Sequence, residues 1–127
     1  MSNTYFRRQA VGFSLIELLV VVLILGLLTA MALPSYLTSV NDSRQGTANA
    51  NAKSLSTAVQ TFAISSGVYD TTLTDYSSDM GGAIPINPCT GTTTGYTITA
   101  SGPTATVAAN AGTLCGTWTP TVFSIWL

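Results

Sequence analysis

Hydrophobic residues divide this chain into three parts. Residues 13–33 form an apolar run interrupted only by Ser14, Glu17 and Thr29. As a helix, this run would rise about 31 Å, which matches a bilayer core of about 30 Å. A polar leader, residues 1–12, precedes it and contains Arg7 and Arg8. Because basic residues favour the cytoplasmic side, the pattern predicts a single N-terminal membrane helix, with the remainder of the chain exported.

The polar segment that follows, residues 35–66, has the periodicity of an amphipathic helix. Apolar residues recur at helical spacing at Ala48, Ala52, Leu55, Val59 and Phe62. Gly67 is a suitable helix end, because glycine accepts the left-handed conformation. We therefore expect helix from Ser14 to Ser66, with the membrane part over residues 13–34 and the amphipathic part over residues 35–66.

Two residues, Gly26 and Pro34, weaken the predicted helix between these halves. Proline lacks the amide donor and its ring clashes with the preceding turn, and glycine is a poor helix former. We expect a kink or local unwinding between them. The alternative is that both are ordinary residues of a membrane helix, where Gly and Pro are tolerated.

The C-terminal part, residues 67–127, is rich in Gly, Thr, Ser and Pro and contains short alternating segments. They predict strands at Tyr96–Ala100, Thr104–Ala108, Cys115–Thr119 and Thr121–Trp126. So small a sheet cannot form a sufficient core by itself. We expect an α+β fold in which a small antiparallel sheet packs on the apolar face of the helix.

Cys89 and Cys115 are the two cysteines of the chain. Two cysteines in a small exported domain usually pair, so we expect a disulfide. The alternative, a metal site, would require further ligands, and the chain has neither a CxxC pair nor a histidine.

Composition argues against several functions. Charged residues make up 7% of the chain, and histidine is absent, which removes the commonest general base and transition-metal ligand. There is no basic patch of the kind a nucleic-acid-binding protein uses. We expect no catalytic site, cofactor or metal, and nothing indicates nucleic acid. Three aromatic residues could stack on bases or sugars, although such residues are more often in the core: Tyr96, Trp118 and Trp126.

The N-terminus allows three interpretations: a cleaved secretory signal peptide, a plain membrane anchor, or a chain cut between Gly12 and Phe13. The apolar run is long for a signal peptide, and an anchor leaves Glu17 without a role. A carboxylate at the centre of a spanning helix costs roughly 2.5–3.5 kcal/mol, and less near the interface. A cut after Gly12 would place a new, largely protonated amine on Phe13, close to this acid.

Ser14 and Glu17 also fit a capping box, the S-x-x-E pattern that closes a helix N-terminus. Such a cap is worth about 1 kcal/mol. It does not offset the burial of an unpaired carboxylate, so a cation is needed as well.

The stretch GFSLIELLVVVLILGLLTAMALP, from Gly12 to Pro34, resembles the N-terminal signature of type IV pilins and their pseudopilin relatives. The similarity covers a basic leader ending in Gly12, Phe13 as the first mature residue, Glu17 four residues later, and Pro34 at the far end of the apolar helix. The C-terminal region matches this family only in its general style, a small sheet with a disulfide-closed loop.

The resemblance implies that a prepilin peptidase cuts the Gly12–Phe13 bond and methylates the Phe13 amine. Glu17 would pair with the Phe13 amine of a neighbouring subunit, and the segment from Gly26 to Pro34 would lose helicity in the filament. The chain would be a homo-oligomeric filament subunit, held first in the inner membrane and then extracellular. Its other partners would be an assembly platform in that membrane, minor pilins and a motor ATPase. Adhesion, twitching motility and DNA uptake are the functions that the family offers.

Alternatives within this resemblance are a minor pilin and a type II secretion pseudopilin. Phe13 and a disulfide favour the pilin. Major pseudopilins often bind calcium, and three acids, Asp70, Asp75 and Asp79, could supply oxygen ligands, but they lack a ligand-loop spacing. A secreted enzyme behind an ordinary signal peptide is disfavoured by the missing histidine and the few carboxylates.

Overall fold

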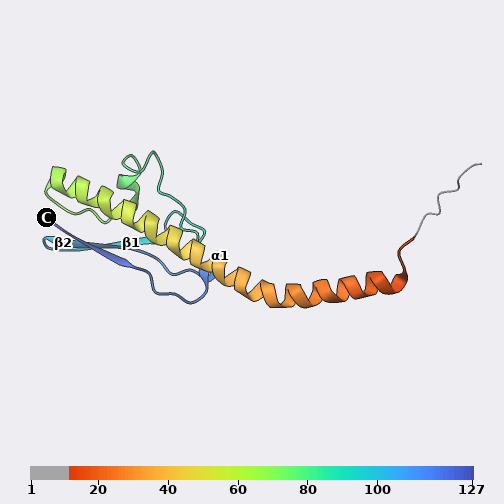
Figure 1. Cartoon of the computed structure of the whole chain (residues 1–127). Helices are drawn as coiled ribbons and strands as arrows, with labels where there is room; N and C mark the ends of the chain where they lie inside the picture. Colours follow the sequence, from red (N-terminus) through yellow and green to blue (C-terminus); the bar gives the residue numbers. More distant parts are fainter. Residues whose placement is uncertain (1–11) are drawn as a thin grey trace, which may run out of the picture. The chain divides into compact units, whose positions relative to one another are not determined.

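The computed structural model describes residues 12–127. The predicted leader, with Arg7 and Arg8, therefore lies outside the described residues except for Gly12. The chain divides into two compact units, Met1–Tyr36 and Leu37–Leu127. One long helix and a three-stranded antiparallel sheet confirm the α+β prediction (Figure 1).

Helix α1, Leu15–Ser66, contributes to both units. Within residues 12–127, it is the one helix long and apolar enough to cross a membrane, a test that a signal sequence also passes. Gly67 ends α1 as expected: its φ of 78° is left-handed, and its amide donates a 2.8 Å hydrogen bond to the Ala63 carbonyl.

The local unwinding expected between Gly26 and Pro34 is absent, and this part of the expectation is wrong for the isolated chain. Every residue from Gly26 to Pro34 is α-helical. Proline removes only one amide donor from the helical ladder, and flanking apolar residues with good helix propensity keep the remaining turns formed. A kink without unwinding, and a loss of helicity on assembly, stay predictions.

The sheet consists of β1 (Tyr96–Ser101), β2 (Thr104–Ala109) and β3 (Val122–Trp126), with β2 in the centre. Both pairings are antiparallel, with Tyr96 opposite Ala109 and Val107 opposite Phe123. Alternate side chains of a strand point to opposite faces. One face therefore turns Tyr96, Ile98 and Val107 into the core.

The core of Leu37–Leu127 forms where this sheet face meets α1. The predicted helix face is confirmed, since Ala48, Ala52, Leu55 and Val59 are buried and Phe62 packs against them. Figure 1 shows the sheet along one side of this part of α1 and the loop over residues 67–95 along another.

The loop after α1 contributes one aromatic anchor to this core. A short 3₁₀ helix, η1 (Leu73–Tyr76), ends in the fully buried Tyr76. Its ring meets Phe62 edge to face, with centroids 5.6 Å apart, and its hydroxyl donates a 2.6 Å hydrogen bond to the Asp70 carbonyl. The loop is thereby fixed to the helix.

The strand predicted at Cys115–Thr119 is wrong. Cys115 ends a second 3₁₀ helix, η2 (Thr113–Cys115), and the residues that follow it do not join the sheet. Gly116 has a φ of 68°, a left-handed conformation that turns the chain out of any extended run. The disulfide therefore joins the loop at Cys89 to a 3₁₀ turn, not to a strand.

Candidate functional site

The first turn of α1 contains the predicted capping box. The amide of Ser14 donates a 2.9 Å hydrogen bond to the Glu17 carboxylate, and the amide of Glu17 donates a 3.2 Å bond to the Ser14 hydroxyl. Both amides belong to the set that a helix N-terminus leaves without a backbone acceptor. The acid therefore has a local role as a cap, which does not neutralise its charge.

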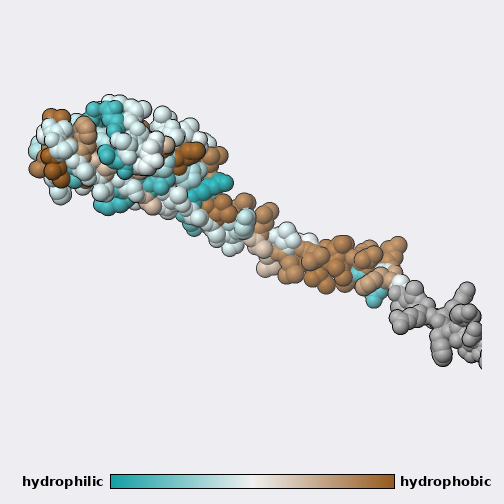
Figure 2. Space-filling model, turned by 90° about the horizontal axis from the view of Figure 1, so that it is seen from above, coloured by the Kyte–Doolittle hydropathy of each residue, from teal (hydrophilic) through white to brown (hydrophobic). Residues whose placement is uncertain are grey.

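Apolar side chains cover the first half of α1 on all sides and are exposed. Exposed fractions run from 43% at Val20 to 82% at Leu15 and Met31. Figure 2 shows this part as a nearly continuous hydrophobic surface. An apolar area of this extent marks a membrane or protein interface, and a helix that is hydrophobic all round is normally a buried one.

Phe13 and Glu17 line the same shallow groove on this helix, together with Ile16, Val20 and Val21. The structure thus brings together two of the residues that the sequence analysis selected. Gly12 and Phe13 precede the helix and are exposed, so the bond between them is not protected by helical structure. Cleavage, methylation and the pairing of Glu17 with a Phe13 amine stay predictions.

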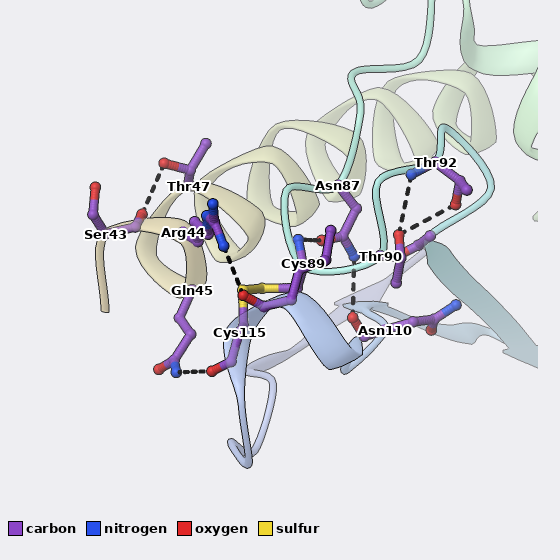
Figure 3. The surroundings of a disulfide bond; sticks show 12 residues. Ser43, Arg44, Gln45, Thr47, Asn87, Cys89, Thr90, Thr92, Asn110 and Cys115 are labelled. Carbon is purple, nitrogen blue, oxygen red and sulfur yellow. Dashed lines mark hydrogen bonds between the residues drawn. A yellow bond between two sulfur atoms is a disulfide. The ribbon is translucent and has the colours of Figure 1, made fainter. Parts of the chain in front are cut away.

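The second group of selected residues forms the predicted disulfide, between Cys89 and Cys115 (Figure 3). Asn87, two residues before Cys89, is completely buried. Its side-chain amide donates to the carbonyls of Gly95 (2.6 Å) and Asn110 (3.1 Å), and its oxygen accepts a 2.8 Å bond from the Cys89 amide. One side chain therefore satisfies three backbone groups from separate segments of the chain.

Two glycines make this packing possible. A Cβ atom at Gly112 would lie 1.9 Å from the Cys89 carbonyl oxygen, and one at Gly95 would lie 2.7 Å from the Asn87 Cβ. These glycines are required for close approach of the backbone.

Polar side chains of α1 hold the C-terminal segment. Arg44 and Gln45 donate to the carbonyls of Leu114 (2.8 Å) and Cys115 (3.1 Å), as Figure 3 shows in part. Further along α1, Asn49 accepts a 3.1 Å bond from the Thr121 amide, and Gln60 donates a 2.8 Å bond to the Trp126 carbonyl. These contacts could not be predicted from the sequence, because their partners are backbone groups 66 to 72 residues away and leave no local signal.

Two of the three acids considered as calcium ligands, Asp70 and Asp75, form a pair. Asp75 shares a hydrogen bond with the Asp70 carboxylate, and this bond raises the pKa of Asp75. The amide of Thr72, 2.7 Å from Asp70 Oδ1, lowers the pKa of Asp70. Over residues 12–127, no group of three or more His, Cys, Asp or Glu side chains is arranged to hold a metal ion.

The three candidate stacking aromatics have different environments. Tyr96 is buried, which raises the pKa of its hydroxyl, and Trp118 is half-buried against the core. Trp126 remains 67% exposed. Of the three, Trp126 is therefore the side chain available to a ligand.

Comparisons with known proteins agree with this arrangement. Residues 8–33 match the family model described as the prokaryotic N-terminal methylation motif. The chain is 36% identical over 101 residues to the type IV major pilin protein PilA of Myxococcus xanthus, a match that covers 80% of this chain and 42% of the relative. It is 33% identical over 66 residues to the type II secretion system core protein G of Pseudomonas aeruginosa, covering 52% of this chain and 46% of the relative.

These matches confirm the resemblance to type IV pilins and type II secretion pseudopilins, a class of structural proteins. The chain spans less than half the length of the two curated relatives. No solved structure matches it significantly. The chain is thus similar to a pilin and to a pseudopilin, and it carries a match to the methylation motif, an apolar N-terminal helix and one disulfide.

Proposed function

We propose that this chain is a pilin, the structural subunit of a type IV pilus. The precursor is stored in the inner membrane through residues 13–34, cut after Gly12, methylated at Phe13, and polymerised into an extracellular helical fibre. Residues 1–12 are the leader that is removed, residues 35–66 the amphipathic half of the helix, and residues 67–127 the disulfide-closed sheet domain on the outside of the filament.

One observation carries this proposal: a carboxylate lies on a helix whose surface is otherwise apolar and exposed. Glu17 faces the same groove as Phe13, and Leu15, Val20 and Leu23 are exposed around the helix. In a bundle of such helices the apolar surfaces cover one another, which the hydrophobic effect favours. The carboxylate then needs a cation, because burial of an unpaired charge is costly.

The amine that a cut at Gly12 creates on Phe13 would supply this cation. Each subunit would then carry one acid and one amine at the same end of its helix, so that neighbouring subunits neutralise each other. N-methylation retains the positive charge. The segment from Gly26 to Pro34, helical in the isolated chain, would lose helicity as the helices pack.

The proposed partners follow from these steps. A prepilin peptidase that also methylates acts on Gly12 and Phe13, and an inner-membrane platform with minor pilins assembles the filament. The finished fibre would serve adhesion, twitching motility or DNA uptake.

A second candidate function is that of a type II secretion pseudopilin, supported by the similarity to core protein G. A minor pilin is a third variant of the same role. All would use Gly12, Phe13 and Glu17 in the same way, so abundance and filament type distinguish them.

Imaging of cells with and without this chain tests the proposal. We expect surface filaments to disappear on deletion and to return with the plasmid-borne chain, which should be the most abundant protein in sheared filaments. Filaments that persist at normal number and length would contradict a major pilin. Loss of protein secretion with intact pili would indicate the pseudopilin.

A further inference from the structure

The outer face of the sheet, the one turned away from α1, carries mostly hydroxyl groups, together with one indole and two aliphatic side chains. Because side chains alternate along each strand, the residues between the buried ones share this face. They are Thr97, Thr99, Ser101, Thr104, Thr106, Ala108, Val122, Ser124 and Trp126.

The strand register arranges these side chains in rows across the sheet. Thr106 of β2 lies between Thr99 of β1 and Ser124 of β3, and the Thr99 and Thr106 hydroxyls are hydrogen-bonded at 2.6 Å. In the next row, Thr104 lies between Ser101 and Trp126. The hydroxyls therefore form a ladder held by the backbone, and the exposed indole of Trp126 stands at its end.

Charge is absent from this region of the sequence. Residues 80–127 contain no Asp, Glu, Lys, Arg or His, so the sheet carries no side-chain charge of its own. Nucleic acids are bound mainly through cations that contact phosphates, and charged partners in general are attracted by opposite charge. The surface offers neither, which leaves an uncharged partner.

We propose that this face binds a neutral polysaccharide, with Trp126 as the stacking platform. A pyranose ring presents apolar C–H groups on its faces and hydroxyls around its edge. The indole can cover an apolar ring face, because Trp supplies a large, rigid apolar surface. The Thr and Ser hydroxyls both donate and accept hydrogen bonds, so they can exchange their mutual bonds for bonds to sugar hydroxyls. A neutral glycan thus matches the surface in both charge and hydrogen bonding.

Binding of the full chain to insoluble glycans tests this proposal. The mature chain is kept in a zwitterionic detergent, because a detergent with a sugar headgroup would compete. It is mixed with microcrystalline cellulose or chitin, both neutral, and its depletion from solution is measured at low and high salt. We expect depletion by at least one of the two polymers that does not change with salt, because no ion pairs are formed.

Substitutions on the sheet locate the binding surface. Trp126→Ala should weaken binding about tenfold, the order of a single aromatic contact, and Trp126→Tyr should retain most of it. The double change Thr99→Val and Thr106→Val, which keeps shape and strand propensity, should also weaken binding. Leu114→Ala is the matched control, since Leu114 is exposed (49%) but lies outside the sheet in η2. Near-UV circular dichroism verifies that each variant is folded.

Three results would overturn the proposal. The first is no depletion by either polymer. The second is wild-type binding by Trp126→Ala. The third is uptake only by charged beads such as heparin–agarose, released by salt, which would indicate a charged partner.

Discussion

Ser14 and Glu17 cap the start of α1 reciprocally, with the Ser14 amide 2.9 Å from the Glu17 carboxylate and the Glu17 amide 3.2 Å from the Ser14 hydroxyl. The cap satisfies two amides but leaves the charge of Glu17 in place. Two roles of this acid, a local cap and a partner for a cation, can therefore be separated by mutation.

The substitution Glu17→Gln separates the capping role from the charge-pairing role, because glutamine preserves the capping box but lacks the charge. We expect normal cleavage after Gly12, a helical precursor in the membrane, and filament yield reduced at least about tenfold. Immunoblots of membranes measure the cleavage, and immunoblots of sheared filaments measure the filament yield.

Two variants serve as controls for Glu17→Gln. Ser14→Ala removes the cap, at a cost of about 1 kcal/mol, and keeps the charge, so filaments should still form. Thr29→Val removes the other polar group of the apolar helix, whose hydroxyl bonds the Leu25 carbonyl at 2.8 Å. Normal filament yield from Glu17→Gln, or its loss from Ser14→Ala alone, would contradict a pairing role for the charge.

The disulfide should stabilise the sheet domain by limiting the unfolded chain. For a loop closed over a sequence separation of 26 residues, the chain-entropy model gives about 3.5 kcal/mol. The pair Cys89→Ser and Cys115→Ser should lower the free energy of unfolding by about that amount. Denaturant titration in detergent, with and without reductant, checks this. An unchanged midpoint would show that the loop is held by Asn87 and the α1 side chains instead.

Gly112→Ala should destabilise the domain by about 3 kcal/mol, the upper range for overpacking, because its Cβ would overlap the Cys89 carbonyl. Gly46→Ala is the matched control, since Gly46 lies on α1 with no atom within 4 Å of an added Cβ. It should stabilise by about 0.5–1 kcal/mol through helix propensity. Thermal unfolding compares the two. Equal effects of the two substitutions would refute the close packing around Cys89.

The Asp70–Asp75 pair should titrate in two separate steps. Asp70, whose pKa is lowered, contributes stability above its unfolded pKa, and this is lost as the pH falls through its depressed folded value. Asp75, whose pKa is raised, contributes stability below its unfolded pKa, and this is lost as the pH rises through its folded value.

Carbon-detected NMR of the carboxyl groups measures both steps of this pair. We expect Asp75 to titrate above the ordinary value of 3.8 and Asp70 below it. Asp75→Asn should leave Asp70 depressed, because the Thr72 amide is its main cause. Coincident titrations at the ordinary value would contradict the pairing.

Local patterns predicted much of this fold. The helical spacing from Ala48 to Phe62 identified the buried face of α1 because a helix repeats its environment every three to four residues. The S-x-x-E pattern identified the cap for the same local reason, and Gly67 the helix end. Alternation identified β1 and β2, although the exact ends were shifted by one residue.

Contacts between distant segments were not predictable in this way. The alternation of CGTWT is typical of a strand, yet Cys115 lies in a 3₁₀ turn that the disulfide and the bond from Gln45 hold in place. Arg44 and Asn49 form hydrogen bonds with backbone groups far along the chain. Asn87 did leave a signal, because Asn before Pro88 often accepts a bond from an amide two residues on, as it does here from Cys89.

A filament built on Phe13 and Glu17 requires that the mature chain begins at Phe13, and intact-mass analysis of the extracellular protein measures this start. We predict that the mature chain begins at Phe13, with one added methyl group on its amine and an intact disulfide. A chain beginning at Met1 would indicate a simple anchor. One beginning at Leu33 would indicate an ordinary signal peptide and would contradict a filament built on Phe13 and Glu17.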